Sequence, residues 1–453
     1  MRNKIISLLM AAVLSAGMIF APAASSERAA AFLPSLSINA EAAAAVSAPT
    51  ADKKSDYYLM DSEYLKVKLS CKTKNAAIYY KIDNGKYKKY TKTIGISKNS
   101  TLYTYAVAGG KKSKVSKYEY HLYPNYTLSV YEGDYDSDQT VKVTSKVPGV
   151  KFYYTLNGKK ATSKSAAFPE KGLKIANTAT LSVHAAKSGW TSSGDSYTYN
   201  INKLDNYKTY YYYNQLNSKE KKAYERLFTA LQNGKNKADL TGLGLDADSV
   251  SNVLFKMLRD VDQYIYIDWY KEDWISWDFS GSECIEVTIN YDTKDKKLQE
   301  RQKNFEKKAA KIIAAAKKQP TAYGKLKYIH DWLVENTHWL LDESDRSVNT
   351  AEGPIINGVS VCGGYAHAFN YLAKSLGFDC IYVVSDDGTH AWNRVKLNGI
   401  WYNLDISWDD LDLYDDNKIH YENFLKSDKT FKETHLPATE YKFVSAPKDY
   451  KAS

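Results

Sequence analysis

The stretch THAWNRVKLNGIWYNLDISW, residues 389–408, contains two apolar runs that are divided only by Asn398-Gly399. Asn-Gly is a preferred pair for a two-residue turn between antiparallel strands, so the stretch predicts a β-hairpin. The turn also determines which residues face one another across the hairpin. The expected pairs are Leu397 with Ile400, Val395 with Tyr402, and Trp392 with Asp405.

This register places His390 and Asp405 on the same face of the hairpin. Side chains alternate between the faces of a strand, and diagonal neighbours on one face have Cα atoms about 7–8 Å apart. Long polar side chains meet across that distance, so we expect a hydrogen bond between the imidazole and the carboxylate. Such a bond orients the ring, favours its charged form and leaves its second nitrogen for another partner. Taken singly, His390 also fits an ordinary strand histidine, and Asp405 an ordinary strand end.

A cysteine upstream of the hairpin lies where a helix is expected to begin. In VCGGYAHAFNYLAKSLGF, residues 361–378, apolar side chains recur at helical spacing after Cys362, and Gly377 ends the pattern. The unpaired N–H groups and the positive dipole end at a helix start stabilise a thiolate and can stabilise an oxyanion. A disulfide between Cys362 and Cys380 is not expected, because about fourteen helical residues separate the two by roughly 20 Å.

Together, Cys362, His390 and Asp405 have the composition of a Cys–His–Asp triad. The motifs VCGGYAHAFNYLAKSLGF and THAWNRVKLNGIWYNLDISWDD resemble the transglutaminase-like superfamily of papain-type thiol enzymes, and the resemblance spans about residues 325–435. It implies that Cys362 is the nucleophile, that His390 is the base and acid, and that Asp405 orients the imidazole.

A few positions near these motifs differ from the pattern of that superfamily. Gly363 stands where a larger polar residue is common after the cysteine, and Ser407 stands where threonine is common. The segment AEGPIING, residues 351–358, also carries a Gly-Pro before the cysteine. These departures concern the shape of the pocket more than the triad, so they affect specificity. Three aromatic residues are expected either to line the acyl site or to pack: Tyr365, Trp392 and Trp408.

The segment from residue 55 to residue 203 contains a strand-rich pattern twice. LKVKLSCKTKNAAIYYKIDNG at 65–85 corresponds to VKVTSKVPGVKFYYTLNG at 141–158, and both contain a tyrosine-rich strand and an Asn-Gly turn. Two copies of about 75 residues predict two antiparallel β-sandwiches in tandem, at 55–123 and 124–203. They resemble the chitobiase/β-hexosaminidase C-terminal-like repeats of secreted bacterial enzymes. That resemblance implies attachment to a cell surface, to cell-wall glycan or to peptidoglycan.

The sequence changes in character after the repeats, and we expect an α+β lead-in at 204–320 before an α+β papain-like domain at 321–445. A long helix is predicted from about Leu298 to Lys317, where it ends before a proline. Strands are expected around YIYIDWY, residues 264–270, and CIEVTINYD, residues 284–292. No catalytic motif is recognised in the lead-in.

The N-terminal stretch MRNKIISLLMAAVLSAGMIFAPA has the basic, apolar and small-residue parts of a secretory signal peptide. We expect residues 1–42 to form a signal peptide and linker, with cleavage after Ala23 or Ala42, and the protein to be secreted or held at the cell surface. A membrane anchor is the alternative interpretation of the apolar run. No later segment is apolar enough to span a bilayer.

The formal net charge of +10 does not indicate nucleic-acid binding, because the excess is not organised in arginine-rich stripes. Residues 52–122 contain sixteen lysines, six acidic residues and no arginine. Lysines spread along strands are typical of a solvated face, and attraction to an anionic cell surface is the alternative. Four cysteines without a CxxC pair, and the absence of an HExxH motif, predict neither a disulfide framework nor a metal site, and no cofactor is expected.

The sequence therefore predicts a multidomain, secreted thiol enzyme that forms a thioester with an amide-linked acyl group of a protein or peptide. Transfer of the acyl group to water makes a peptidase or amidase, and transfer to an amine makes a transglutaminase. The alternative is a surface-binding or adhesive protein in which the β repeats bind cell-wall glycan and the triad is vestigial or secondary.

Overall fold

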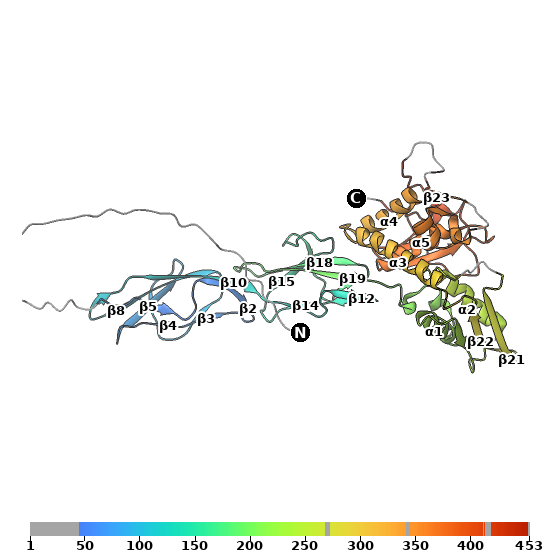
Figure 1. The fold of residues 1–453 in the computed structure, drawn as a ribbon. Coiled ribbons are helices and arrows are strands. Elements are labelled where there is room, and N and C mark those ends of the chain that lie inside the picture. Colours follow the sequence, from blue (N-terminus) through green and yellow to red (C-terminus); the bar gives the residue numbers. More distant parts are fainter. Residues whose placement is uncertain (1–44, 268–271, 341–344, 411, 413–417, 452–453) are drawn as a thin grey trace, which may run out of the picture.

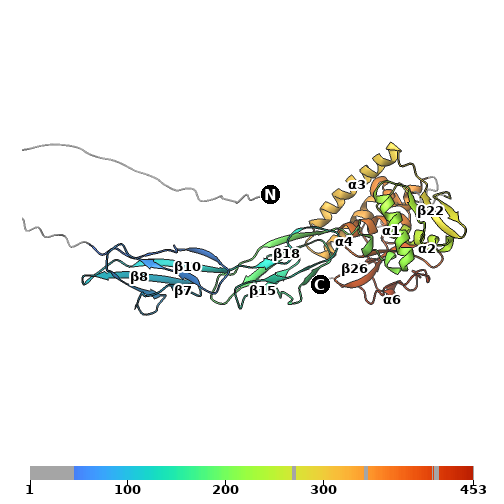
Figure 2. The same ribbon diagram turned by 90° about the horizontal axis from the view of Figure 1, so that it is seen from below.

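The computed structural model describes residues 45–267, 272–340, 345–410, 412 and 418–451. The chain is multidomain and elongated: two β-rich segments lie end to end and lead to a C-terminal part that contains the helices (Figures 1 and 2). The signal peptide predicted at 1–42 lies outside the described residues. Within the described part of the chain, no helix has both the length and the apolar character needed to cross a membrane.

The first β-rich segment is built on one long sheet. Its strands are β1 (Thr50–Ala51), β2 (Asp56–Met60), β3 (Leu65–Val67), β4 (Leu69–Ser70), β5 (Ala77–Ile82), β6 (Lys88–Lys89), β7 (Ile94–Ile96), β8 (Ser100–Ala108), β9 (Lys111–Lys112) and β10 (Ser116–Pro124). The main sheet has the order β2-β10-β8-β5-β6, with β9 beside β8, and two small sheets, β1-β4 and β3-β7, accompany it. Alternate side chains such as Val67, Ile96 and Leu122 point inward and form the core.

The second β-rich segment has the same topology. Its strands are β11 (Thr127–Leu128), β12 (Gly133–Tyr135), β13 (Gln139–Val141), β14 (Val143–Thr144), β15 (Lys151–Thr155), β16 (Ala166–Ala167), β17 (Leu173–Ile175), β18 (Ala179–Ala186) and β19 (Ser196–Ile201). The order β12-β19-β18-β15-β16 matches β2-β10-β8-β5-β6 strand for strand. The small sheets β11-β14 and β13-β17 likewise match β1-β4 and β3-β7.

The prediction that these sheets are antiparallel throughout is wrong at one edge of each segment. β2 pairs in parallel with β10, and β12 pairs in parallel with β19. Parallel neighbours need a long connection, and here almost the whole segment connects the edge strand to its partner. The chain therefore enters and leaves each segment in the same direction, which lets the two segments follow one another in series (Figure 1).

The lead-in folds around a core of its own. Its elements are η1 (Tyr207–Thr209), η2 (Tyr213–Gln215), α1 (Ser218–Gln232), β20 (Lys237–Asp239), α2 (Ala247–Asp260), β21 (Ile275–Ser280) and β22 (Glu283–Ile289). α1 begins with a capping box, in which the side chains of Asn217 and Glu220 each accept a hydrogen bond from the backbone N–H of the other. The antiparallel sheet β20-β22-β21 and the two helices share one apolar cluster.

The strand predicted around residues 264–270 is wrong for residues 264–267, which form turns. Ile265 packs in the core of the C-terminal region, whereas Ile267 packs in the core of the lead-in. The apolar residues here connect two cores and do not pair with a neighbouring strand. Residues 268–270 lie outside the described part of the chain.

The C-terminal region combines three long helices with a three-stranded sheet. Its elements are α3 (Lys296–Lys317), α4 (Ala322–Asn336), β23 (His338–Trp339), η3 (Arg346–Asn349), η4 (Gly353–Asn357), β24 (Val359–Ser360), α5 (Cys362–Ser375), β25 (Cys380–Val384), β26 (Ala391–Leu397), β27 (Ile400–Leu404) and α6 (Asp428–Phe431). The antiparallel sheet β25-β26-β27 packs against α5. α3, α4 and α5 share one core with this sheet, so the boundary predicted between residues 320 and 321 separates two helices of a single core.

Specific polar contacts join the second β-rich segment to the C-terminal region. The side-chain amide of Asn177 donates a hydrogen bond to the carbonyl oxygen of Gly377 at 2.9 Å. The buried ammonium group of Lys203 lies 2.8 Å from a carboxylate oxygen of Asp138 and 2.6 Å from one of Asp379. These contacts place one end of the β-rich segment against the helices of the C-terminal region (Figure 2).

Candidate active site

Cys362 is the first residue of α5, where the sequence places it. The residue before it, Val361, offers no side-chain cap, so the first N–H groups of the helix have no side-chain acceptor from the cap position. Gly364 allows the surrounding chain to approach closely, because a Cβ there would lie 2.2 Å from the carbonyl oxygen of Val348 and 2.3 Å from Oγ of Ser360. The helix start is thus tightly supported, and its dipole favours negative charge at Cys362.

The hairpin forms with the predicted two-residue turn. Asn398 and Gly399 have φ angles of 52° and 84°, the left-handed values that a turn of this type requires. β26 pairs with β27 in the predicted register, Leu397 opposite Ile400 and Val395 opposite Tyr402. The ladder ends with Asn393 opposite Leu404, one position before the predicted Trp392–Asp405 pair.

His390 and Asp405 meet as this register requires. Nε2 of His390 lies 2.6 Å from Oδ2 of Asp405. Burial lowers the pKa of His390, but hydrogen bonds and charge interactions with Asp405 and Cys362 outweigh it and raise that pKa to about 10. Since Nε2 contacts the carboxylate, Nδ1 is the ring nitrogen left for the sulfur. The structure therefore joins His390 to Asp405 by a hydrogen bond and places Cys362 beside His390 in the lining of one cavity.

Asp405 has two further partners besides His390. Its side chain is buried, the hydroxyl of Ser407 donates to Oδ1 at 2.7 Å, and Nε2 of His435 lies 2.9 Å from Oδ2. Burial raises the pKa of Asp405, but the hydrogen bonds with His390 and His435 outweigh this effect and lower the pKa to about 2. A charged carboxylate is therefore held in a fixed orientation behind the His390 ring.

No local pattern in the sequence predicts that His435 lies at the site. His435 follows α6, thirty positions after Asp405, and neither a strand register nor a helical period relates the two residues. Its side chain is buried between the rings of Phe431 and Trp408, at centroid distances of 4.2 and 4.6 Å. A late histidine followed by an apolar residue was the only signal available in the sequence.

The three aromatic residues near the motifs have different positions. Trp392 is buried and stacks on the His390 ring at a centroid distance of 5.9 Å. Trp408 is 38% exposed and lies 5.6 Å from the same ring, so it flanks the site from the solvent side. Tyr365 is buried and donates its hydroxyl hydrogen bond to Asp410, which makes it a packing residue.

A cavity of about 260 Å³ opens beside Cys362 and His390. One wall comes from the lead-in, because Phe255, Leu258 and Arg259 of α2 line it. The lead-in, in which the sequence shows no catalytic motif, therefore shapes the space in front of the sulfur. Phe255 is half exposed at this wall.

A buried polar network fixes the lead-in against α5. Asp262 lies 2.7 Å from Nδ1 of His367, accepts a hydrogen bond from Nδ2 of Asn370 at 2.8 Å, and pairs with Nζ of Lys374 at 3.3 Å. Nζ of Lys374 also donates to the carbonyl oxygen of Asp260 at 2.6 Å. Because His367 lines the cavity beside Cys362, this network also holds one part of the cavity wall in place.

His390, Asp405 and His435 also form a group whose ligand atoms lie within 4.8 Å of one another. The separations of 2.6 and 2.9 Å are those of hydrogen bonds, and both imidazoles share the same carboxylate oxygen. An ion bound there would have to take Nε2 of His390 away from Asp405. The arrangement therefore fits an oriented imidazole better than a metal centre.

Comparison with known proteins points to the same two parts of the chain. The sequence model of the transglutaminase-like superfamily matches residues 307–406, and that of the chitobiase/beta-hexosaminidase C-terminal domain matches residues 130–198. No curated protein matches this chain.

Two solved structures have similar parts. One, a candidate cysteine protease from Cytophaga hutchinsonii, is 23% identical over 23% of this chain and 37% of its own, with a TM-score of 0.20. The other, described as a TGase, is 16% identical over 39% of this chain and 53% of its own, with a TM-score of 0.22. The chain thus covers 37% of the first protein and 53% of the second, and the assignment of roles rests on the residues themselves.

Proposed function

We propose that this chain, with a transglutaminase-like domain at residues 307–406, is a secreted thiol enzyme that transfers amide-linked acyl groups of proteins or peptides. The observation that carries the proposal is the His390 ring, which is hydrogen-bonded to Asp405 and lines one cavity with Cys362 at the start of α5. In this proposal Cys362 is the nucleophile, His390 is the base and acid, and Asp405 orients the ring.

The proposed reaction begins with the thiolate of Cys362 beside a protonated His390, which its pKa of about 10 keeps charged at neutral pH. The sulfur attacks the carbonyl carbon of an amide, and the carbonyl electrons move to the oxygen. The first N–H groups of α5 stabilise that oxyanion. His390 gives its proton to the amide nitrogen, the C–N bond breaks, and the amine leaves. The acyl group remains on Cys362 as a thioester.

The second half of the reaction releases the acyl group. Neutral His390 takes a proton from the incoming water or amine, which attacks the thioester carbon and expels the thiolate. Water yields a carboxylic acid, and an amine yields a new amide. The cavity of about 260 Å³ has room for a side chain of the substrate against Phe255 and Arg259.

The β-rich segments are proposed to hold the enzyme at a cell wall, by binding glycan or peptidoglycan. The match of residues 130–198 to the chitobiase/beta-hexosaminidase C-terminal domain supports this part of the proposal. The signal-like pattern at residues 1–42 supports secretion.

A thiol-directed electrophile tests the nucleophile directly. Iodoacetamide is added to the intact protein, and the modified cysteines are identified by mass spectrometry of peptides. We expect Cys362 to react first, since Cys284 and Cys380 are buried and burial raises the pKa of both thiols. The variant Cys362→Ala should lose this rapid labelling and all amide turnover, whereas Cys71→Ala should keep both. Equal labelling rates at Cys362 and Cys71, or turnover that survives Cys362→Ala, would contradict the proposal.

The acyl-enzyme identifies the substrate and the acceptor. The protein is incubated with a mixed extract of cell wall and protein, quenched with acid, and digested, so that the fragment bound to Cys362 can be read by its mass. Release of the trapped fragment by water alone indicates a hydrolase, and release that depends on an added primary amine indicates a transferase. Tight glycan binding with no acyl-enzyme from any extract would favour the adhesive alternative.

A further inference from the structure

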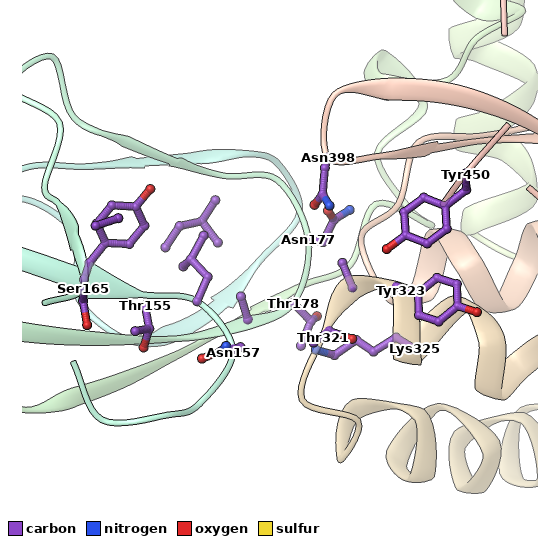
Figure 3. Close-up of a pocket in the computed structure, with 16 residues that line it drawn as sticks. Thr155, Asn157, Ser165, Asn177, Thr178, Thr321, Tyr323, Lys325, Asn398 and Tyr450 are labelled. Atoms are coloured by element: carbon purple, nitrogen blue, oxygen red, sulfur yellow. The ribbon is translucent and has the colours of Figure 1, made fainter. Parts of the chain in front are cut away.

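A second, larger cavity lies far from the cysteine, at the junction of the second β-rich segment and the C-terminal region. It measures about 710 Å³, and its walls come from both parts of the chain (Figure 3). Asn157 and Thr178 line it from the β-rich segment, and Lys325 of α4 and Asn398 of the hairpin turn line it from the other side. None of its lining residues lines the cavity beside Cys362, so the two spaces are separate.

A neighbouring cavity of about 370 Å³ continues this space. It shares Asn157, Thr178 and Lys325 with the first cavity, and it adds three further lysines: Lys159, Lys317 and Lys318. We call the two cavities together the junction cleft. Among the described residues, those that line the junction cleft include four lysines and no aspartate or glutamate. The described lining of the cleft is therefore cationic.

Lys325 is the central feature of the junction cleft. Its side chain runs from α4 toward Asn157 and Thr178 of the β-rich segment (Figure 3). Only 4% of the residue is exposed, and among the described residues its ammonium group makes no ion pair and no hydrogen bond. Burial lowers the pKa of Lys325, and no neighbouring charge opposes this effect. An ammonium group without a partner, at the end of a buried side chain that reaches into the cleft, points to an anionic ligand that supplies the partner.

The remaining walls fit a sugar polymer better than a simple ion. Tyr323 and Tyr450 stack at a centroid distance of 4.8 Å with an interplanar angle of 11°, and both line the cleft, as does Tyr154. Flat aromatic rings with polar tips pack against the apolar faces of sugar rings. The amides of Asn157 and Asn398 offer the donors and acceptors that sugar hydroxyls need.

We propose that the junction cleft binds an anionic polysaccharide, with one of its carboxylate or phosphate groups paired to the ammonium group of Lys325. The site exists only where the second β-rich segment meets the C-terminal region, so neither part forms it alone. Because the cleft is separate from the cavity of Cys362, a bound polymer holds the enzyme without occupying the acyl site. This binding site stands whether or not Cys362 proves to be a nucleophile.

Binding is tested with the full chain and four defined probes, by isothermal titration calorimetry at low and at high salt. The probes are polygalacturonate, which carries carboxylates, a phosphomannan, which carries phosphates, the neutral chitin hexamer, and poly-L-glutamate. We expect either polygalacturonate or the phosphomannan to bind, and the one that binds identifies the acid group. Its affinity should fall with salt, since screening weakens charge pairing at the rim of the cleft.

Three lysine variants test the placement. Lys325→Met should weaken binding about ten-fold or more, because it removes a charge-assisted hydrogen bond from a buried site. Lys318→Gln, at an exposed position of the cleft, should weaken binding by a smaller factor without disturbing the fold. Lys311→Met, on an exposed position of α3 outside the cleft, is the matched control and should bind as the unchanged chain does.

Thermal unfolding separates a binding role from a structural one. Without a probe, Lys325→Met should melt at the same temperature as the unchanged chain or higher, because it removes an uncompensated buried charge. The binding polymer should raise the melting temperature of the unchanged chain and leave that of Lys325→Met nearly the same. Failure of both anionic polysaccharides to bind, binding of the chitin hexamer or of poly-L-glutamate with equal affinity, or equal weakening by Lys311→Met would overturn the proposal. Labelling of Cys362 should be the same in all three variants.

Discussion

Replacing His435 by phenylalanine should slow the alkylation of Cys362 strongly, although His435 touches neither the sulfur nor the cavity. The change removes the hydrogen bond of 2.9 Å between Nε2 of His435 and Oδ2 of Asp405. It keeps a flat ring of similar size between Phe431 and Trp408, at 4.2 and 4.6 Å. The variant therefore removes a donor from the carboxylate while the packing is largely kept.

The size of the effect follows from the burial of Asp405. A hydrogen bond to a buried charged group contributes about 1.5–3 kcal/mol, which is roughly ten-fold to a hundred-fold in a rate constant. Without His435, Ser407 and His390 are the side-chain donors that remain to the carboxylate among the described residues, so its pKa rises and it orients the imidazole less firmly. The assay is the second-order rate constant for iodoacetamide at Cys362, which requires no knowledge of the substrate.

A double variant and a control histidine test whether His435 acts through Asp405. In the background of Asp405→Asn, the change His435→Phe should have little further effect, because both act through one carboxylate. The matched control is His330→Phe: His330 is equally buried and lies 3.2 Å from Asp409, which is not the carboxylate that contacts His390. It should lower stability and leave the alkylation rate unchanged. Alkylation of His435→Phe at the unchanged rate, or an equal loss in the Asp405→Asn background, would refute the reasoning.

Three further predictions concern stability, each measured by urea unfolding followed by tryptophan fluorescence. Asp262→Asn should destabilise the C-terminal region by about 3–5 kcal/mol, because it leaves the buried Lys374 without its carboxylate partner. Adding Lys374→Met should restore part of the lost stability. No recovery in the double variant would argue against the ion pair. Gly399→Val should cost about 1–2 kcal/mol, because its φ of 84° strains a β-branched residue, and an unchanged midpoint would contradict this. Because the pKa of His390 is raised, its pair with Asp405 stabilises the fold fully below pH 6.5, and this contribution is lost as the pH rises through about 10. The variant Asp405→Asn should lack that alkaline decline in stability. An identical decline in both proteins would show that the His390–Asp405 pair is not its cause.

The lead-in shows how a segment without a motif takes part in a site. Its residues Phe255 and Arg259 line the cavity, and Asp262 contacts Nδ1 of His367 on α5. Each of these residues is ordinary in its local sequence, since a charged or aromatic residue near the end of a helix has many uses. Only the packing of α2 against β25 and the hydrogen bonds of Asp262 to α5 give them a place beside Cys362, so no pattern within the lead-in could identify them.

The sequence by itself determined those features that depend on neighbours along the chain. The Asn398-Gly399 turn imposes a register, and that register places His390 and Asp405 on one face, because side chains alternate along a strand. Helical spacing after Cys362 likewise predicts a helix start there, and the structure has it. The twofold pattern of strands and turns predicts two similar β-rich segments, and the shared strand order agrees with it.

Tertiary structure alone decided everything that depends on contacts between distant parts of the chain. Three such features are the parallel edge strands β2 and β12, the contact of His435 with Asp405, and the cleft around Lys325. Each brings together segments that no turn, strand register or helical period relates. The free energy of such contacts comes from burial and from the pairing of charges across the core. Local sequence patterns do not predict which distant surfaces come into contact. The pairing of His390 with Asp405 was therefore predictable from the sequence, whereas the contact of His435 with Asp405, the cavity wall from the lead-in and the junction cleft appear only in the fold.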